Sequence, residues 1–266
     1  MKRPMLALAL CLAAGPAMAC GTETDCPLGD RTYRIHLPQG HDGTTPLGAL
    51  VFAHGYKGSA AGTMRNGALR AMADQLGIAL VAANAKGDDW LLPNAPSGKV
   101  SSPDTALAYF DALREDIVAT HAVDPDRIVM SGFSAGGMVT WTLACHRPGD
   151  YAGFIPVAGT FWAPSPETCK MPPADIVHIH GTSDRIVPLA GRPIGDTRQG
   201  DVDTILAMYR KTGGHAASQA PALDDGLICQ AWTAPNDTSL LKCLHPGAHR
   251  FRTEWLAAAW NLILSD

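Results

Sequence analysis

The stretch that most constrains the fold of this chain runs from residue 127 to residue 145 and reads RIVMSGFSAGGMVTWTLAC. Its first part is an apolar run with β-branched residues, and its last part has the apolar spacing of a buried helix. Between them lies a glycine-rich turn around Ser134, with Gly132 two residues before the serine and Gly136 two residues after it. A side chain at either glycine would collide with the neighbouring strand or helix of so tight a turn. The stretch therefore predicts a strand, a sharp turn and a helix.

Ser134 is expected to project from this turn at the N-terminus of the helix. There the helix dipole and the free backbone N–H groups favour negative charge, which develops when a serine attacks a carbonyl group. Gly-x-Ser-x-Gly between a strand and a helix is typical of a nucleophilic serine, and the alternative is an ordinary capping serine in a glycine-rich connection. We predict that Ser134 is a nucleophile and that the backbone N–H of Ala135 is one oxyanion donor.

Strand and helix patterns alternate along most of the chain. Strands are expected over 31–38, 47–53, 78–83, 153–159, 174–181, 227–233 and 239–244, and helices over 60–76, 101–121, 202–211 and 253–264. The first strand is expected to lie at a sheet edge, and 191–200 to be a polar loop. This alternation predicts an α/β fold with a mostly parallel central sheet and helices on both faces. A chain of 266 residues is long enough for one large core, so we expect residues 20–266 to form a single catalytic domain without a large lid.

The first 19 residues are predicted to be a secretory signal peptide. Two basic residues precede a short apolar segment, and Ala17-Met18-Ala19 precedes Cys20 as a cleavage site would. The apolar segment is too short to span a membrane. We therefore expect a secreted or periplasmic protein cleaved after Ala19, with a lipoprotein acylated on Cys20 as the alternative.

The cysteine count fits an oxidising compartment. Cys11 would leave with the signal peptide, and an even number of cysteines remains. Fifteen pairings of these cysteines are formally possible. Our hypothesis is the sequential pairing, because each bridge then closes a local loop: Cys20–Cys26, Cys145–Cys169 and Cys229–Cys243. Acylation of Cys20 would leave Cys26 unpaired, so the even count favours secretion without a lipid anchor.

Charge and composition limit the partners. The net charge is −4 with acids and bases scattered along the chain, which argues against a nucleic-acid groove. His178 and His180 share one strand face at a spacing that metal sites use, but no cysteine or carboxylate cluster accompanies them. We expect no metal, no cofactor, no nucleic acid and no membrane span, and we expect a monomer.

Three segments carry a resemblance to a known family: VDPDRI at 123–128, SGFSAGGM at 131–138 and IPVAG at 155–159. They resemble the secreted α/β-hydrolase esterases grouped as polyhydroxybutyrate depolymerase-like and feruloyl esterase-like. The resemblance covers nearly the whole chain after the signal peptide. It implies the α/β-hydrolase fold and a Ser-Asp-His triad without a metal. Members differ in substrate, so the resemblance implies an ester but no particular one.

The same resemblance implies the other two triad members. The strand over 174–181 ends in His-Gly, and Asp184 in the following loop matches the acid position, where it would orient the catalytic histidine. His249, in a Gly-x-His sequence before the terminal helix, matches the base. His245, before a proline at a strand end, is the alternative base. Either choice gives the chain order Ser, Asp, His of α/β hydrolases.

Three further residues are candidates for the surroundings of the serine. His54-Gly55 leaves a buried strand where α/β hydrolases place the second oxyanion donor, so we assign that donor to the backbone N–H of Tyr56 and a structural role to His54. Trp162 follows a strand at the rim where open α/β sheets bind ligands, and it is expected to wall the acyl pocket. Trp90, in a loop rich in glycine and proline, is a second candidate for substrate contact.

The function predicted from these features is hydrolysis of carboxylic esters through an acyl-serine intermediate. The expected substrate is an extracellular ester. Polymers are among the candidates: a polyhydroxyalkanoate-type polyester or a plant polysaccharide ester. An acetyl or short-chain esterase and an aromatic polyester esterase are alternatives. A secreted serine peptidase would use the same triad, and a non-catalytic binding protein on this scaffold would keep the fold without the chemistry.

Overall fold

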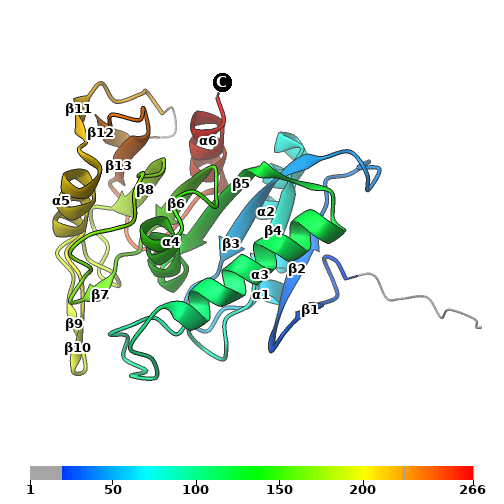
Figure 1. Ribbon diagram of the computed structural model, residues 1–266, viewed down its shortest axis with the longest axis horizontal. Coiled ribbons are helices and arrows are strands. Elements are labelled where there is room, and N and C mark those ends of the chain that lie inside the picture. The colour runs from blue at the N-terminus through cyan, green and yellow to red at the C-terminus, as the bar shows by residue number, and fades with distance from the viewer. Residues whose placement is uncertain (1–19, 224–225, 266) are drawn as a thin grey trace, which may run out of the picture.

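The computed structural model describes residues 20–223 and 226–265; the signal peptide expected over 1–19 lies outside these residues. In this described part a sheet of 10 strands crosses the molecule in the order β1-β2-β4-β3-β5-β6-β8-β13-β12-β11 (Figure 1). Its strands are β1 (Cys26–Leu28), β2 (Arg31–His36), β3 (Leu47–Ala53), β4 (Ala79–Ala83), β5 (Val123–Phe133), β6 (Gly153–Val157), β8 (Ile176–Gly181), β11 (Ala216–Ser218), β12 (Ile228–Thr233) and β13 (Ser239–His245).

The middle of this sheet is parallel. Strands β4, β3, β5, β6, β8 and β13 pair in parallel from neighbour to neighbour, and β2 and β12 flank them in antiparallel pairing. Strands β3, β4, β6 and β8 are buried along their whole length, as expected of parallel strands covered on both faces. The predicted mostly parallel sheet is confirmed, and the carboxyl ends of its central strands share one edge.

Helices cover both faces of the sheet, as predicted (Figure 1). The helices are α1 (Ala60–Arg65), α2 (Gly67–Leu76), α3 (Asp104–Thr120), α4 (Ala135–His146), α5 (Val202–Gly213) and α6 (Thr253–Ile263). Apolar residues of α3, α4 and α5 belong to the core on one face, and those of α1, α2 and α6 to the core on the other. Helix α4 is buried nearly all round, which matches a sequence of apolar residues, glycines and threonines with no charged side chain before His146.

Three local expectations are corrected. The helix expected over 60–76 is two helices, because Asn66 adopts an extended conformation and its side chain accepts hydrogen bonds from the amides of Ala68 and Leu69 at the start of α2. Strand β2 is not an edge strand, because the short β1 pairs outside it. The polar loop expected over 191–200 contains a hairpin of β9 (Pro193–Ile194) and β10 (Thr197–Gln199), which pairs with β7 (Trp162–Ala163) in a separate small sheet.

The sequential disulfide pairing is confirmed. Cys20 bonds Cys26, Cys145 bonds Cys169, and Cys229 bonds Cys243. The last pair lies directly opposite in the ladder between β12 and β13, so it fastens the strand that leads to the loop of His249. Among residues 20–223 and 226–265, no helix has both the length and the apolar character needed to cross a bilayer.

Candidate active site

Ser134 occupies a strained turn between β5 and α4. Its backbone has φ 60° and ψ −119°, a left-handed region that residues with a side chain rarely adopt. The turn is held by hydrogen bonds from the Ser134 N–H to the Val157 carbonyl at 2.9 Å and from the Met138 N–H to the Ser134 carbonyl at 3.0 Å. The strand, turn and helix predicted around this serine are therefore present.

The two glycines that flank Ser134 are required by close backbone contacts. A Cβ atom on Gly132 would lie 2.3 Å from the carbonyl oxygen of Gly136, and one on Gly136 would lie 1.9 Å from the carbonyl oxygen of Ala53. Strands β3 and β5 and helix α4 thus approach one another without room for a methyl group. This is the physical reason for the glycine spacing in the sequence.

Two backbone segments adjoin the serine as oxyanion candidates. Ala135 is the first residue of α4, so its N–H has no acceptor within the helix. The turn after β3 carries Tyr56, and a Cβ atom on Gly55 in this turn would lie 3.4 Å from the Ser134 Cβ. The next amides of the turn are used: Lys57 donates to the Asp88 carbonyl at 3.0 Å, and Gly58 donates to the Gly55 carbonyl.

His54 and Trp90 hold this turn through hydrogen bonds to its backbone. The His54 Nδ1–H donates to the Gly55 carbonyl at 2.8 Å, and Nε2 accepts from the Ala85 N–H, so both ring nitrogens serve the backbone. Trp90 has no exposed surface, and its Nε1–H donates to the His54 carbonyl at 2.8 Å. The expectation that Trp90 contacts substrate is therefore corrected: its indole is a buried prop for the end of β3 and packs against Phe110.

Asp184 and His249 come together in the loops that follow two neighbouring parallel strands. Strand β8 leads to the loop of Asp184, and its neighbour β13 leads to the loop of His249. The His249 Nδ1–H donates to Asp184 Oδ2 at 2.6 Å, while Oδ1 accepts from the amides of Ile186 and Val187 at 2.8 and 2.9 Å. Burial acts to raise the pKa of Asp184, but the bonds from His249 and the two amides outweigh it and lower that pKa below its usual value.

The ring of His249 lies beside the serine turn. Its centroid is 4.6 Å from that of Phe133, the residue immediately before Ser134. His245 faces away: it is buried, its Nδ1 accepts from the Gly247 N–H at 3.0 Å, and its ring stacks on Trp255 in α6 at 4.3 Å. The structure therefore pairs Asp184 with His249 and gives His245 a place in the packing of α6.

A chain of buried hydrogen bonds, which we call the histidine relay, runs behind Asp184. The Trp141 Nε1–H donates to His178 Nδ1 at 3.2 Å, His178 Nε2–H donates to His180 Nδ1 at 3.1 Å, and His180 Nε2–H donates to the Val187 carbonyl at 2.7 Å. The tryptophan N–H can only donate, so it fixes the tautomer of each ring after it. Burial lowers the pKa of both histidines, which keeps them neutral.

Sequence reasoning missed the relay. It considered His178 and His180 only as metal ligands, but their ring nitrogens are occupied by one another, by Trp141 and by backbone. The available signal was a pair of histidines alternating on one buried strand that leads into the acid loop.

Trp162 lies away from the serine. It lines a pocket of about 190 Å³ together with Thr142 and His146, near the C-terminal end of α4. At about 1.5 Å per residue, Thr142 lies roughly 12 Å along the helix from Ser134. The expectation that Trp162 walls the acyl pocket is therefore corrected: Trp162, in β7, lines this separate pocket instead.

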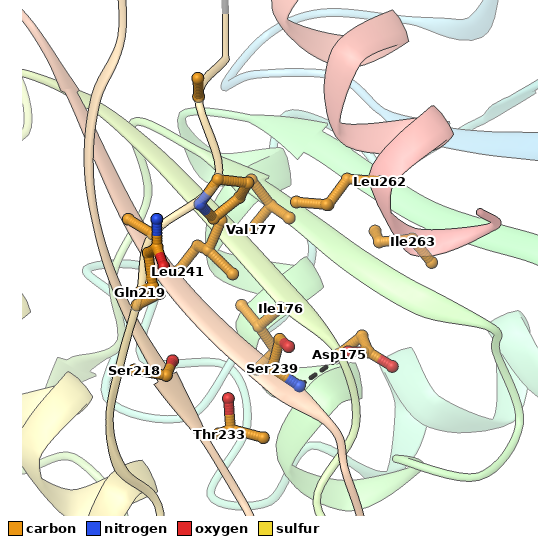
Figure 2. A pocket seen from close by; sticks show the side chains of 14 residues that line it. Asp175, Ile176, Val177, Ser218, Gln219, Thr233, Ser239, Leu241, Leu262 and Ile263 are labelled. Carbon is orange, nitrogen blue, oxygen red and sulfur yellow. Dashed lines mark hydrogen bonds between the residues drawn. The ribbon is translucent and has the colours of Figure 1, made fainter. Parts of the chain in front are cut away.

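A larger pocket of about 440 Å³ lies at the opposite edge of the sheet (Figure 2). Asp175 and Ser239 line it, and they stand at the amino ends of β8 and β13, where the Ser239 N–H donates to the Asp175 carboxylate at 2.7 Å. The length of β8 at about 3.3 Å per residue separates this pocket by roughly 20 Å from the loop of Asp184. It is not part of the candidate site.

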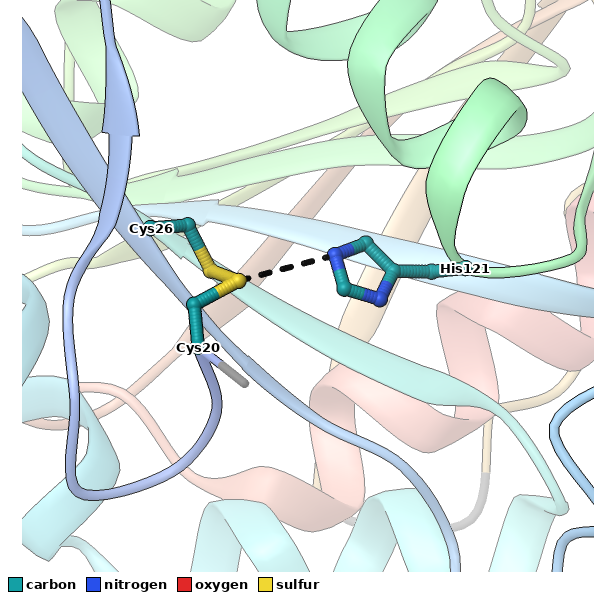
Figure 3. Close-up of side chains that lie close together, drawn as sticks. All are labelled: Cys20, Cys26 and His121. Carbon is teal, nitrogen blue, oxygen red and sulfur yellow. Dashed lines mark hydrogen bonds between the residues drawn. A yellow bond between two sulfur atoms is a disulfide. The ribbon is translucent and has the colours of Figure 1, made fainter. Parts of the chain in front are cut away.

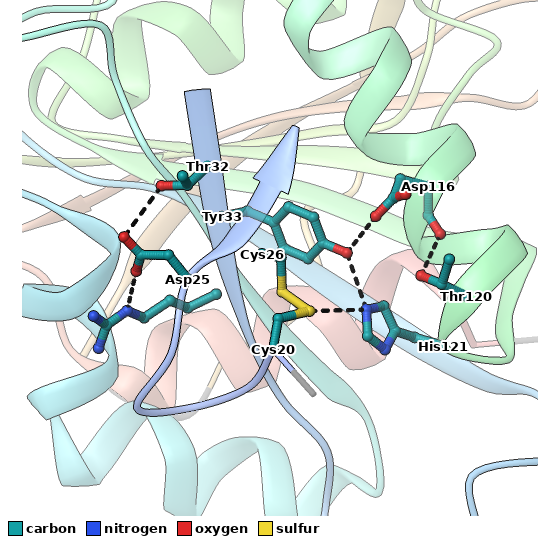
Figure 4. Close-up of a disulfide and its surroundings, with 9 residues drawn as sticks. Cys20, Asp25, Cys26, Thr32, Tyr33, Asp116, Thr120 and His121 are labelled. Carbon is teal, nitrogen blue, oxygen red and sulfur yellow. Dashed lines mark hydrogen bonds and ion pairs between the residues drawn. A yellow bond between two sulfur atoms is a disulfide. The ribbon is translucent and has the colours of Figure 1, made fainter. Parts of the chain in front are cut away.

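One group in the described part of the chain has the spacing of metal ligands: Cys20, Cys26 and His121 (Figure 3). The two sulfur atoms are bonded to each other and thus cannot act as thiolate ligands. The imidazole of His121 instead shares a hydrogen bond of 2.9 Å with the hydroxyl of Tyr33, which also donates to Asp116 (Figure 4). This cluster fastens the start of the described chain to the end of α3.

A serine turn between strand and helix, an acid after β8 and a histidine after β13 are together the arrangement of the α/β-hydrolase fold. This chain has that fold, and comparisons with known proteins agree with it. The family model described as Phospholipase/Carboxylesterase matches residues 88–194.

Two curated relatives match part of the chain. "Putative esterase NocK" of Nocardia uniformis subsp. tsuyamanensis is 33% identical over 168 residues, 60% of this chain and 47% of that protein. "Feruloyl esterase C" of Emericella nidulans is 26% identical over 173 residues, 62% of this chain and 58% of that protein. The chain thus spans about half the length of these relatives. Among solved structures, esterase PE8 superposes with a TM-score of 0.58 at 18% identity, covering 86% of this chain and 97% of that one.

Proposed function

We propose that this protein is a serine esterase that hydrolyses carboxylic esters. The observation that carries the proposal is the 2.6 Å hydrogen bond between Asp184 and His249, made where the imidazole lies against Phe133 beside the strained turn of Ser134. A carboxylate, an imidazole and a serine at one sheet edge are the parts of an acyl-transfer triad. The partial matches to an esterase and a feruloyl esterase support the same reaction class.

In the proposed mechanism, the Ser134 Oγ attacks the ester carbonyl while His249 Nε2 takes the proton of the Ser134 hydroxyl. The backbone N–H groups of Tyr56 and Ala135 stabilise the oxyanion, and loss of one such donor typically costs about 10²- to 10³-fold in turnover. His249 then protonates the leaving alcohol, and water repeats the steps to release the acid. Asp184, whose lowered pKa keeps it ionised, orients the imidazole and stabilises its charged form.

For the substrate we propose an ester of the polyhydroxybutyrate depolymerase-like or feruloyl esterase-like class. Two large hydrophobic side chains on the loops of the site support an apolar or polymeric ester: Tyr56 is 61% exposed and Ile186 is 52% exposed. Acetyl or short-chain esters and aromatic polyesters remain the alternative substrates, and peptides a more distant one.

We further propose that residues 20–266 act as one catalytic domain, as a monomer, after export and cleavage of residues 1–19. The three disulfides support the export part of this proposal, because such bonds persist in secreted and periplasmic compartments and are rare in reducing ones.

The test uses a fluorophosphonate probe and a hydrolysis panel of p-nitrophenyl esters, methyl ferulate and a polyhydroxybutyrate suspension. We expect the probe to label the wild type and Ser101→Ala, an exposed control serine, but not Ser134→Ala. Ester hydrolysis should follow the same pattern. Labelling that persists in Ser134→Ala, or cleavage of peptides without cleavage of esters, would contradict the proposal.

A further inference from the structure

A pocket adjoins the serine turn on the side of α1 and α2; we call it the elbow pocket. Its volume is about 190 Å³. Its lining includes aromatic and aliphatic side chains and small residues: Phe52, Gly55, Gly62, Leu69, Phe133 and Phe251.

The elbow pocket opens beside the proposed reacting groups. Gly55 and Phe133 both line it. A Cβ atom on Gly55 would lie 3.4 Å from the Ser134 Cβ, and the Phe133 ring lies 4.6 Å from the ring of His249. The lining of the elbow pocket therefore adjoins both Ser134 and His249.

The walls of the elbow pocket are apolar and aromatic. The ring of Phe251 lies 5.5 Å from that of Phe52 and 5.2 Å from that of Phe133, so the three rings form one continuous surface. Leu69 is buried beneath it. Such a surface binds apolar groups by excluding water from both partners.

The side-chain oxygens of Ser59, Thr63 and Asn66, which line the elbow pocket, already have partners within the protein. The Ser59 Oγ accepts from the Gly62 N–H at 3.0 Å, and the Thr63 hydroxyl donates to the Ser59 carbonyl at 3.3 Å. The side-chain oxygen of Asn66 accepts from the Ala68 N–H at 3.1 Å. A polar group that entered the pocket would compete with these helix caps, so the lining favours an apolar occupant.

We propose that the elbow pocket holds the apolar end of the acyl group and selects esters of short aliphatic or single-ring acids. This inference rests on the proposed esterase function. In the proposed mechanism the leaving oxygen faces His249, so the alcohol part of the ester lies toward the loop of His249 and the acyl part toward the segment that carries Tyr56. Most of the pocket lining comes from that segment, residues 52–69. The size fits as well, because an apolar cavity of roughly 150 Å³ accommodates benzene.

The experiment compares kcat/KM for p-nitrophenyl acetate, butyrate and benzoate, in which the leaving group is constant. Gly62→Ala adds one methyl group at a residue that lines the pocket, where the new Cβ would lie 3.3 Å from Ser59 Oγ. Gly67→Ala makes the same change at the start of α2, where no atom lies within 4 Å of the new Cβ. One methyl group in an apolar pocket changes discrimination by about 10-fold or more. We expect Gly62→Ala to lower the ratios of butyrate and of benzoate to acetate by about 10-fold, and Gly67→Ala to leave them at the wild-type value.

Phe251→Ala enlarges the same pocket and should act in the opposite direction. We expect its ratio of p-nitrophenyl octanoate to acetate to rise by about 10-fold over the wild type. Unchanged ratios in both Gly62→Ala and Phe251→Ala would overturn the inference, as would shifts that follow the alcohol in a series of alkyl butyrates. A folded wild type that hydrolyses no ester of the panel would instead overturn the proposed function itself.

Discussion

Two histidine systems meet at the carboxyl end of β8, and their surroundings differ. His249 reaches Asp184 from the loop after β13, keeps 14% of its side chain exposed and lies against Phe133 beside the serine turn. The histidine relay lies inside the molecule, and the side chains of His178 and His180 are fully buried. His249 donates to the Asp184 carboxylate, whereas His180 donates to the Val187 carbonyl and lies 3.6 Å from Asp184 Oδ2.

The difference separates proton transfer from positioning. An imidazole that accepts a proton is favoured by a nearby negative charge, and Asp184 supplies it to His249. His180 lies beside the same carboxylate, but its burial outweighs that charge and its pKa is still lowered. The relay is sealed from water, and Lys242 and the neighbouring ring oppose a positive charge on His178. It can therefore hold the Val187 carbonyl, and with it the loop whose amides bind Asp184, but it cannot take up a proton at low cost.

The largest effect is expected from His249→Ala. Removal of the histidine of a serine triad costs on the order of 10⁶-fold in kcat. Steady-state hydrolysis of p-nitrophenyl butyrate measures this, with circular dichroism to confirm folding. The matched variant is His245→Ala, which should lose far less activity because His245 packs on Trp255 and not on Asp184. If the two variants exchange these outcomes, His245 is the base.

Asp184→Asn should have the next largest effect. The amide keeps the size of the side chain but favours the wrong tautomer of His249, and the equivalent change in a serine triad costs about 10⁴-fold in kcat. The variant should still react with a fluorophosphonate probe, only more slowly. A loss below about 10-fold would show that Asp184 is not the orienting carboxylate.

Trp141→Phe tests the histidine relay. It removes the N–H that donates to His178 and also shrinks a buried indole to a phenyl ring. The unpaired ring nitrogen alone costs about 1–3 kcal/mol of unfolding free energy, and the cavity adds to that cost. Turnover should fall by at most about 10²-fold, because only the position of the acid loop is disturbed. Urea denaturation followed by circular dichroism measures the stability.

The control for that experiment is Trp232→Phe, the same chemical change in a half-buried residue of β12. It should cost less stability than Trp141→Phe. A turnover loss in Trp141→Phe as large as that of Asp184→Asn would remove the distinction between the two histidine systems.

The serine turn could be predicted from sequence because its signature is a short contiguous pattern. Gly132 and Gly136 stand within a few residues of Ser134, although the carbonyl oxygen that excludes a side chain at Gly136 belongs to Ala53 on β3. The alternation of strands and helices likewise needs only short-range patterns. The relay could not be predicted, because Trp141 comes from α4 and meets His178 of β8 only through packing. Trp90 and Trp162 were misjudged for the same reason: their position in a loop after a strand does not fix which way an indole packs.

The smallest expected effect is a change in how stability depends on pH. The pKa of His178 is well below its usual value, chiefly because of burial, so this ring stays neutral in the folded protein. A histidine of the unfolded chain binds a proton below about pH 6.5. The unfolded state therefore takes up more protons as the pH falls, so the stability that the neutral ring contributes is present above about pH 6.5 and is lost below it.

His178→Gln isolates this contribution, because the amide can still accept from Trp141 and donate to His180 but cannot be protonated. We expect the free energy of unfolding of the wild type to fall more steeply between about pH 6.5 and 5, with a difference in slope of up to about 1.4 kcal/mol per pH unit. Urea denaturation at closely spaced pH values measures both slopes. Equal slopes would mean that His178 binds a proton as readily in the folded protein as in the unfolded chain. The relay would then be a second protonatable system beside His249 and not a neutral support for the acid loop.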